Sequence, residues 1–334
     1  MPKGYIPLAD ARATQADALS HAVAALAEDI RVLQGRNFLQ GPGPIFLGIG
    51  ASFAASASAV WTLRSRGIHS WRLNAGEHPL PFPVTPHPLV GVSQSGKSSE
   101  TLAALQTVDQ RLRLSVVNAH NSPIETISAA HLSLGNIPDS YASTIGYTAT
   151  VAALGMLAEA WDAGEIDSTW LQLSDAFRVV EKTLASRIGA LIAPLQDAHY
   201  VDCVGSAASA GSAEVGALLL REIARIPSTG MATRQYLHGA MESAGRGVHI
   251  IFGEEREVQL AQKLARAGHD VILASPLDIC EENHLAHVAV PSLSPAQRPI
   301  VEALVMQTLA VETAIARGLD PDAFVFENND TKVA

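Results

Sequence analysis

One stretch of this 334-residue chain constrains its fold more than any other: an apolar run that turns through small polar residues into a helical pattern. The run at 89–92 is typical of a buried strand, and apolar residues from Thr101 to Val108 recur at helical spacing. Between them lies Ser93-Gln94-Ser95-Gly96-Lys97-Ser98. A strand, a turn and a helix in this order predict a parallel α/β unit.

The turn has the chemistry of an anion site. The first backbone NH groups of a helix have no intrahelical partner, so they attract negative charge. The hydroxyls of Ser93, Ser95 and Ser98 add donors, and Gly96 permits close backbone approach or a positive φ angle. The turn therefore predicts a phosphate site that relies on neutral donors.

The turn has two other interpretations, a nucleotide-binding loop and a helix cap without a ligand. Gly91-x-x-x-x-Gly96-Lys97-Ser98 matches the P-loop pattern of nucleotide-binding proteins. Against a P-loop, Gly91 lies inside the expected strand, and no later apolar strand ends in an evident magnesium-binding Asp. The second alternative is a serine-rich helix cap without a ligand, because such caps are common.

The alternation of strands and helices runs through the chain twice. Strands are expected at 45–50, 71–74, 89–92, 114–117, 199–205, 248–253, 270–273 and 287–290. Helices are expected at 53–65, 98–112, 213–226, 257–267 and 296–317. Gly48-x-x-Ala51-Ser52 recurs as Gly205-x-x-Ala208-Ser209, which indicates a duplicated unit. The fold class predicted is α/β, with two doubly wound, flavodoxin-like parallel sheets whose ligands gather at the carboxyl ends of the strands.

This pattern divides the chain into an N-terminal helical segment (1–40), a phosphate-binding domain (41–165), a connecting helix (166–195) and a second domain with a C-terminal tail (196–334). An apolar helix is expected from about Ser143 or Thr144, either of which is a natural cap, through Leu157. The connecting helix should end at Pro194.

Composition excludes several classes of function. A net charge of −10 argues against a nucleic-acid partner, which requires a basic face. The start of the chain lacks an apolar signal core, and no uncharged span of about 18 apolar residues is available for a membrane helix. Cys203 and Cys280 are far apart and lack metal-type spacing, which favours reduced thiols. We expect a cytoplasmic protein without a membrane partner.

Close histidine pairs occur at His120 with His131 and at His284 with His287. Neither pair has a well-placed third ligand, although two glutamates precede the second pair. We therefore expect surface or core histidines and no metal site.

Several segments together resemble the SIS (sugar isomerase) family. They are Gly50-Ala51-Ser52, Ser93-Gln94-Ser95-Gly96-x-Ser98-x-Glu100-Thr101, Ala142-Ser143-Thr144, Glu222 and Leu237-His238-Gly239. More narrowly, these segments resemble the double-SIS isomerase half of glutamine-fructose-6-phosphate transaminases and its free-standing relatives, which include SIS-type glucosamine-6-phosphate deaminases and sugar-amine phosphate deglycases. The resemblance runs from about Ile30 to the C-terminus and implies a cofactor-free enzyme that acts on a sugar phosphate.

The resemblance also assigns residues. It implies that Ser52, Ser93, Gln94, Ser95 and Ser98 bind the sugar phosphate, with Ser143 near the sugar hydroxyls. It implies that Glu222, at the end of Gly216-Ala217-Leu218-Leu219-Leu220-Arg221-Glu222, moves the proton between C1 and C2. His238 would open the sugar ring from the neighbouring subunit of a homodimer, and Lys332 matches a lysine that folds over the site.

The chain departs from the family at two positions of the catalytic helix. Leu219 stands where the transaminase has a lysine, and Val215, beside Glu214, stands where it has an acidic residue. The loss of the lysine weakens the case for a Schiff-base step. Because the sequence shows no N-terminal Cys and no glutaminase domain, glutamine-dependent synthesis is not expected.

Each assigned catalytic residue also has a simpler interpretation. Glu222 follows an apolar run that would raise its pKa, as a proton-transfer base requires, yet it could pair with a nearby arginine instead. His238 suits ring opening by its near-neutral pKa, or it could merely cap a helix. Glu242 is a weaker second acid, and Lys332 could be a frayed terminal charge.

These residues predict an isomerase or deaminase of an aminosugar or ketose/aldose 6-phosphate, of the glucosamine-6-phosphate/fructose-6-phosphate type. A deglycase of a sugar-amine 6-phosphate uses the same chemistry and is one alternative. The other is a sugar-phosphate sensor that has kept the phosphate site and lost the reaction, as Leu219 and Val215 suggest.

Overall fold

The structure, a computed structural model, describes residues 4–245, 247–326 and 330–333. Two five-stranded sheets are built in the order β2-β1-β3-β4-β5 and β7-β6-β8-β9-β10, and every pair of neighbouring strands is parallel. The first sheet contains β1 (Ile45–Gly48), β2 (Trp71–Asn74), β3 (Leu89–Ser93), β4 (Arg113–Val117) and β5 (Ala130–Ser133). The second contains β6 (Val201–Gly205), β7 (Ser228–Ala232), β8 (Val248–Phe252), β9 (Asp270–Ser275) and β10 (Leu285–Ala289). The repeated order confirms the predicted fold class.

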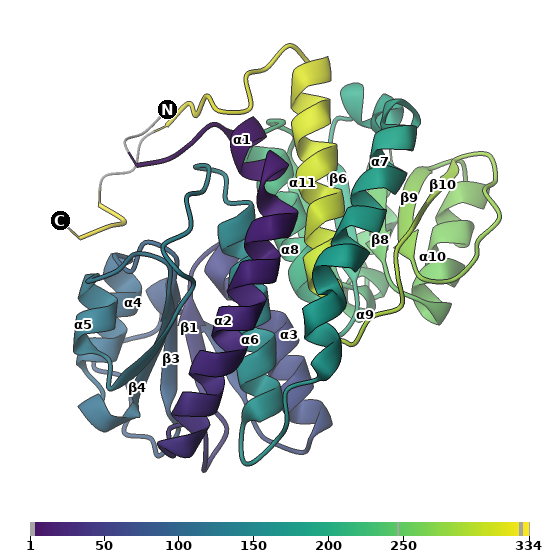
Figure 1. Ribbon diagram of the computed structural model, residues 1–334. Coiled ribbons are helices and arrows are strands. Elements are labelled where there is room, and N and C mark those ends of the chain that lie inside the picture. The colour runs from purple at the N-terminus through teal and green to yellow at the C-terminus, as the bar shows by residue number, and fades with distance from the viewer. Residues whose placement is uncertain (1–3, 246, 327–329, 334) are drawn as a thin grey trace.

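Helices cover the sheets and fill the space between them (Figure 1). The first half has α1 (Leu8–Ala13), α2 (Gln15–Gly35), α3 (Ala51–Ser65), α4 (Ser99–Gln106), α5 (Pro123–Ile127) and α6 (Ile145–Ala160). The second half has α7 (Leu173–Gln196), α8 (Ser209–Glu222), α9 (Thr233–Leu237), α10 (Glu255–Arg266) and α11 (Arg298–Ala316). Four short 3₁₀ helices complete the set: η1 (Ala75–Glu77), η2 (Gln110–Leu112), η3 (Ser168–Gln172) and η4 (Ala240–Ser243).

The duplicated glycine motif is a duplicated piece of structure. A Cβ on Gly48 would lie 2.9 Å from backbone and side-chain atoms of Ser52, and a Cβ on Gly205 would lie 2.4 Å from the Ser209 carbonyl oxygen. Both glycines end a first strand of their sheet and allow the following helix to begin directly against it. The two sheets thus share a strand order and a strand-to-helix turn.

Apolar helices between the sheets form the core of the molecule. Helix α6 is buried almost throughout, and α3 packs against both α6 and α8. Helix α11 has the length and composition of a membrane span, but 83% of that window is buried inside the protein. It packs against α7 and α8, and we therefore describe it as a core helix (Figure 1).

Several local predictions differ from the structure. The helix predicted at 98–112 ends at Gln106, and β5 was not among the predicted strands. Helix α7 continues past Pro194, which lies in its last turn, where a lost backbone hydrogen bond costs least. Helix α8 begins and ends four residues earlier than the predicted range 213–226, so Glu222 is its last residue rather than an interior one. Strand β7 was not predicted, because an edge strand that contains Gly230 and little apolar alternation gives a weak signal. Neither Ser143 nor Thr144 caps α6 with its side chain, since that role belongs to Asp139.

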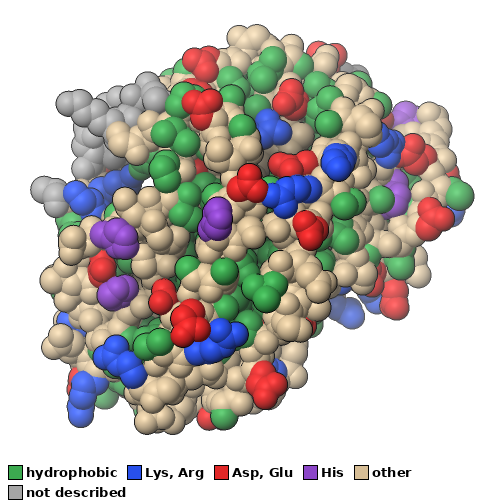
Figure 2. Space-filling model, viewed as in Figure 1, with side chains coloured by type: hydrophobic (Ala, Val, Ile, Leu, Met, Phe, Trp, Pro, Cys, Tyr) green, Lys and Arg blue, Asp and Glu red, His purple; other side chains and the backbone are tan. Residues whose placement is uncertain are grey.

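Acidic and basic side chains are interspersed over the face that carries α2, α7 and α11 (Figure 2). That face has no extended basic surface. The cysteines are free thiols, with Cys203 buried and Cys280 exposed.

Candidate active site

The turn between β3 and α4 is tightly built. The NH of Gly96, at φ +62°, donates to the Ser93 carbonyl over 3.0 Å, and the Gln94 carbonyl accepts from the NH groups of Asn118 and Ala119 over 3.0 and 3.1 Å. A Cβ on Gly96 would lie 2.0 Å from the Ser122 Oγ. Only glycine therefore satisfies both the conformation and the space. We call residues 93–98 the cradle.

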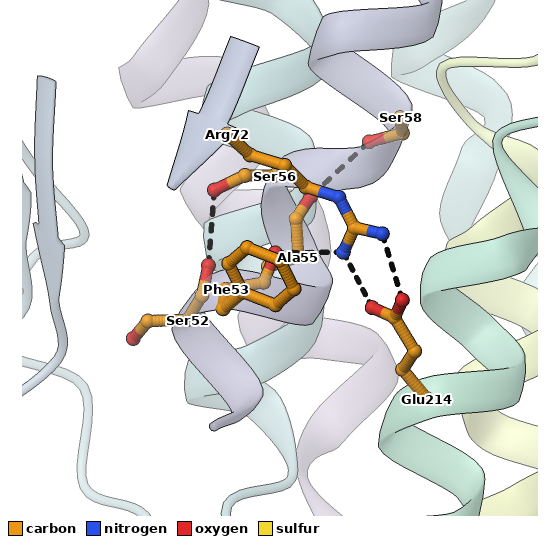
Figure 3. A network of polar contacts seen from close by, with 7 residues as sticks. All are labelled: Ser52, Phe53, Ala55, Ser56, Ser58, Arg72 and Glu214. Atoms are coloured by element: carbon orange, nitrogen blue, oxygen red, sulfur yellow. Dashed lines mark hydrogen bonds and ion pairs between the residues drawn. The ribbon is translucent and has the colours of Figure 1, made fainter. Parts of the chain in front are cut away.

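A second polar turn lies at the same sheet edge. Ser52 is in the first turn of α3, directly after β1, and β1 pairs with β3. The cradle and Ser52 therefore flank the point where the strand order reverses, which is where open α/β sheets bind ligands. Figure 3 shows that the Ser52 hydroxyl points away from the Arg72–Glu214 pair.

Asp139 holds the cradle to α6, and sequence reasoning missed it. Its buried carboxylate accepts from the Gln94 Nε2 and the Ser143 Oγ, each over 2.8 Å. It also accepts from the backbone NH groups of Thr144 and Gly146, so it caps α6. One amide NH of Gln94 is committed to Asp139, and the Gln94 Oε1 makes no hydrogen bond with a described residue. Gln94 and Ser143, both assigned by the resemblance, are thus held by the same carboxylate, that of Asp139.

The C-terminal tail lies against the cradle. The NH of Val333 donates to the Lys97 carbonyl over 2.9 Å, and Lys332 forms an antiparallel bridge with Ser98. The Lys332 ammonium donates to the Tyr5 hydroxyl over 3.2 Å and lies 5.9 Å from the ring centroid of Tyr141. Within the described residues Lys332 is therefore docked at the cradle and is not a frayed terminal charge.

One stripe of α8 faces the first domain. Its members follow helical spacing: Gly211, Glu214, Leu218 and Glu222. The first three make packing or polar contacts with the first domain, Gly211 with Ala54, Glu214 with Arg72 and Leu218 with Gly50. The contacts advance along α3 towards its N-terminal end, and Gly50 is its N-cap. Glu222 lies one turn, about 6 Å, beyond Leu218 and so at the edge that carries the cradle.

Arg72 and Glu214 fix the angle between α8 and the first sheet. The guanidinium forms a bidentate pair with the Glu214 carboxylate, and its carbon lies 4.2 Å from the ring centroid of Phe53 (Figure 3). Glu214 is thus occupied by a structural contact, and Val215 and Leu219 are buried in the core. The helix consequently offers Glu222 as its carboxylate at the cradle edge.

Glu222 has the properties of an accessible base. It forms no ion pair or hydrogen bond through its side chain with any described residue, so the pairing with Arg221, Arg225 or Arg234 is not observed. Desolvation by the surrounding protein raises the pKa of Glu222 to about 7. The residue is nevertheless solvent-exposed, and water reaching it screens part of this effect.

His238 lies away from the other predicted residues of its own chain. Strand β7 runs back along α8, since Arg221 donates to the Ser228 carbonyl and Gly230 packs against Glu214. The chain therefore leaves the Glu222 end of α8, a helix about 20 Å long, before it reaches His238. His238 is exposed as the C-cap residue of α9 and makes no side-chain hydrogen bond with a described residue.

The equivalent edge of the second sheet has a different set of side chains. Only Gly253 and Glu254 separate β8 from α10, and Glu255 and Glu257 occupy the first turn of that helix. Glu254, Glu255 and Glu257 line a recess of about 290 Å³ together with Arg234, Arg256 and Arg298, and Arg298 forms an ion pair with Glu254. Ser209, the counterpart of Ser52, donates to the buried carboxylate of Glu302 instead.

The histidine pairs serve local contacts. His131 lies 3.3 Å from the Glu125 carboxylate, and the His284 Nδ1 lies 2.8 Å from an Asp270 carboxylate oxygen. The His287 Nε2 lies 3.2 Å from the Ser275 carbonyl oxygen. Among the residues that the structure describes, no group of three or more His, Cys, Asp or Glu side chains converges as a metal site would require.

Comparison with known proteins identifies the family. No family model matches the chain. A glutamine–fructose-6-phosphate aminotransferase (isomerizing) of Bradyrhizobium diazoefficiens is 31% identical over 252 residues, which cover 69% of this chain and 41% of that protein. The chain thus spans less than half the length of the curated relatives that it matches first.

Solved structures show the same fold. The C-terminal domain of glucosamine-fructose-6-phosphate aminotransferase from Francisella tularensis superposes with a TM-score of 0.83 at 18% identity, covering 96% of this chain and 98% of that one. Tagatose-6-phosphate ketose/aldose isomerase from Escherichia coli gives 0.73 at 18% identity, covering 98% and 100%. Glucosamine-6-phosphate deaminase from Thermotoga maritima gives 0.69 at 17% identity, covering 92% of this chain and 96% of that one.

The homologous region is the isomerase part of the aminotransferases, and both sheets have the arrangement of tandem SIS domains. The chain belongs to the SIS (sugar isomerase) family, as a double-SIS protein with the fold of phosphosugar isomerases.

Proposed function

We propose that the protein catalyses proton transfer between C1 and C2 of an aminosugar or ketose/aldose 6-phosphate, as an isomerase or deaminase that does not depend on glutamine. The observation that carries this proposal is the α8 stripe, which leads an unpaired, accessible carboxylate to the sheet edge that holds the cradle. The neutral donors of the cradle bind the phosphate, as the net charge of −10 requires of any local anion site.

The residues divide the work as follows. Ser52 and the serines of the cradle, Ser93, Ser95 and Ser98, donate to the phosphate oxygens, while Gln94 and Ser143 position the sugar through Asp139. Glu222 removes the proton from one carbon and returns it to the next, because a carboxylate with a raised pKa can both accept and release it near neutral pH. Lys332, presented by the tail, closes the site.

The active unit is a homodimer in which His238 comes from the partner subunit. Within one chain β7 carries the backbone away from Glu222 before His238 is reached, so a histidine from a second copy is the simpler source of the ring-opening group. An imidazole has one nitrogen that can accept a proton and one that can donate it, which suits proton transfer between the ring oxygen and the hydroxyl.

The assay detects the transferred proton directly. The protein is incubated in D₂O with glucosamine 6-phosphate, fructose 6-phosphate and tagatose 6-phosphate, and deuterium at C1 or C2 is followed by NMR, with ammonium measured in parallel. We expect deuterium to enter at least one sugar, and ammonium release would identify a deaminase. Absence of deuterium with every sugar, in a protein that binds them, would contradict the proposal.

A non-catalytic sensor is the second candidate, favoured by one observation. Leu219 and Val215 are buried apolar residues on the catalytic helix, so α8 has no lysine for a Schiff base with the sugar carbonyl. A sensor predicts a rise in Tm with sugar phosphates and no exchange in D₂O. The same pair of measurements therefore separates the two candidates.

A further inference from the structure

A buried polar cluster lies beneath the loop that carries His238. Asp202 on β6 and His249 on β8 are register partners, and the Tyr236 side chain from α9 meets them. The Tyr236 hydroxyl lies 3.3 Å from the His249 Nδ1, and the same nitrogen lies 3.7 Å from an Asp202 carboxylate oxygen. Tyr236 and His249 are fully buried, and Asp202 is 5% exposed. We call these three residues the Tyr236 cluster.

Burying the Tyr236 cluster in the core costs folding free energy. The His249 Nε2 and one Asp202 oxygen have no hydrogen-bond partner among the described residues, and a buried polar atom without a partner is destabilising. Burial lowers the pKa of His249 to about 4, which keeps the imidazole neutral at physiological pH. A phenylalanine and two apolar residues would fill this space without these costs. A polar network in such a place is better explained by the precision with which it holds a side chain.

What the cluster holds is the His238 loop. Helix α9 is one turn long, and a helix of this length is unstable unless tertiary contacts hold it. Tyr236 is its buried anchor, and His238 follows two residues later. On the other side of His238, the Tyr200 hydroxyl donates to the Ser243 carbonyl at the end of η4 over 2.6 Å. His238 is thus exposed on a short segment that is held by buried Tyr236 on one side and by the Tyr200–Ser243 hydrogen bond on the other.

We propose that Tyr236 is a positioning residue: through Asp202 and His249 it sets the direction in which its own chain presents His238 to the partner's site. The inference rests on the proposed function, because it assigns to Tyr236 an effect exerted through His238. It implies that loss of one buried hydroxyl in the second domain slows ring opening in the other subunit and leaves the proton transfer at Glu222 intact.

The first test compares substrates that need ring opening with one that does not. For Tyr236→Phe we expect kcat on fructose 6-phosphate to fall about 10-fold to 100-fold with KM changed by less than about 3-fold, since a misplacement of about 1 Å costs up to 10²-fold. 5-Deoxyfructose 6-phosphate cannot close through O5, so Tyr236→Phe and His238→Ala should both approach the wild-type rate on it. A Tyr236→Phe protein that is equally slow on both sugars would overturn the inference.

Ser212→Ala is the matched control for this variant. It also removes one buried hydroxyl from the second domain, where Ser212 donates to the Glu302 carboxylate. It leaves the Tyr236 cluster and the His238 loop untouched. We expect a lower Tm in both variants but an unequal kcat effect, confined to Tyr236→Phe. Equal kcat losses in the two variants would show that general destabilisation, rather than positioning, is responsible.

The second test uses heterodimers, purified through two different tags after co-expression. A Tyr236→Phe chain paired with a Glu222→Gln chain keeps one intact site, formed by its own Glu222 and the partner's intact histidine loop, so about half of the wild-type activity is expected. Paired with a His238→Ala chain it has no intact site, and activity should stay at the level of the Tyr236→Phe homodimer. The reverse pattern would overturn the inference.

The Glu222→Gln/His238→Ala heterodimer separates this inference from the proposed function. Recovery of about half of the wild-type activity supports donation of His238 by the partner. If this heterodimer is inactive, the trans arrangement fails, and the 5-deoxy sugar still decides whether Tyr236 acts through His238.

Discussion

Replacing Glu222 with Gln is expected to lower kcat by about 10²-fold to 10⁴-fold, the range typical for loss of a positioned general base. Glutamine keeps the size of the side chain but cannot take a proton, so KM and the Tm rise caused by sugar phosphate should change little. Deuterium exchange in D₂O measures the effect. Glu181→Gln is the matched control, because burial also raises the pKa of Glu181, on α7, away from the cradle. Full activity of Glu222→Gln would remove the assignment.

The raised pKa of Glu222 predicts how activity and stability depend on pH in the wild-type protein and in Glu222→Gln. Only the ionised carboxylate accepts a proton, so wild-type kcat/KM should rise with pH through the neutral range. The raised pKa means that the folded protein holds this proton more tightly than the unfolded chain, whose ordinary Glu value is 4.5. The contribution of this group to stability therefore falls as pH rises from about 4.5 towards 7. Both trends should be absent in Glu222→Gln.

Replacing Gly96 with Ala is expected to weaken sugar-phosphate binding by at least about 10-fold. The added Cβ would meet the Ser122 Oγ at 2.0 Å and its Cβ at 2.3 Å, so the cradle must move away from α5. Positive φ adds a cost of about 1–2 kcal/mol for a non-glycine residue. Isothermal titration with an unreactive ligand, sorbitol 6-phosphate, measures the loss of affinity.

Gly67→Ala provides the control for strain alone. Gly67 has φ +78° and no atom within 4 Å of an added Cβ, so it shares the backbone strain of Gly96 without the clash. We expect Gly67→Ala to lower Tm and to bind sorbitol 6-phosphate normally. Equal affinity in the two variants would show that the cradle does not contact the phosphate.

Features that depend on residues adjacent in the sequence could be predicted from it. The cradle was recognised because its hydroxyls and Gly96 follow one another between a strand and a helix. The duplicated α/β unit was inferred because strand and helix patterns alternate in the same way in both halves, and the strand order of the two sheets confirms it. The predicted bounds of α8 were four residues too late at both ends, because the small residues from Ser209 onward gave no clear helix start.

Features that depend on distant contacts were not predictable. Asp139 is 45 residues from Gln94, and nothing in the spacing of polar residues links the two. The antiparallel bridge from Lys332 to Ser98 depends in the same way on tertiary packing. Asp139-x-x-x-Ser143-Thr144 is the one local signal, since an acidic residue just before an apolar helix is a natural cap. The role of His238 in a second subunit stays a prediction.

The central claim is that the cradle in one domain and Glu222 in the other serve a single substrate. A crystal structure with sorbitol 6-phosphate, an open-chain sugar alcohol, tests it most directly. We predict the phosphate at Ser93, Ser95 and Ser98 and the C1–C2 end of the ligand within hydrogen-bonding distance of the Glu222 carboxylate. A phosphate bound elsewhere, or a ligand whose C1–C2 end points away from Glu222 in every subunit arrangement, would contradict the account.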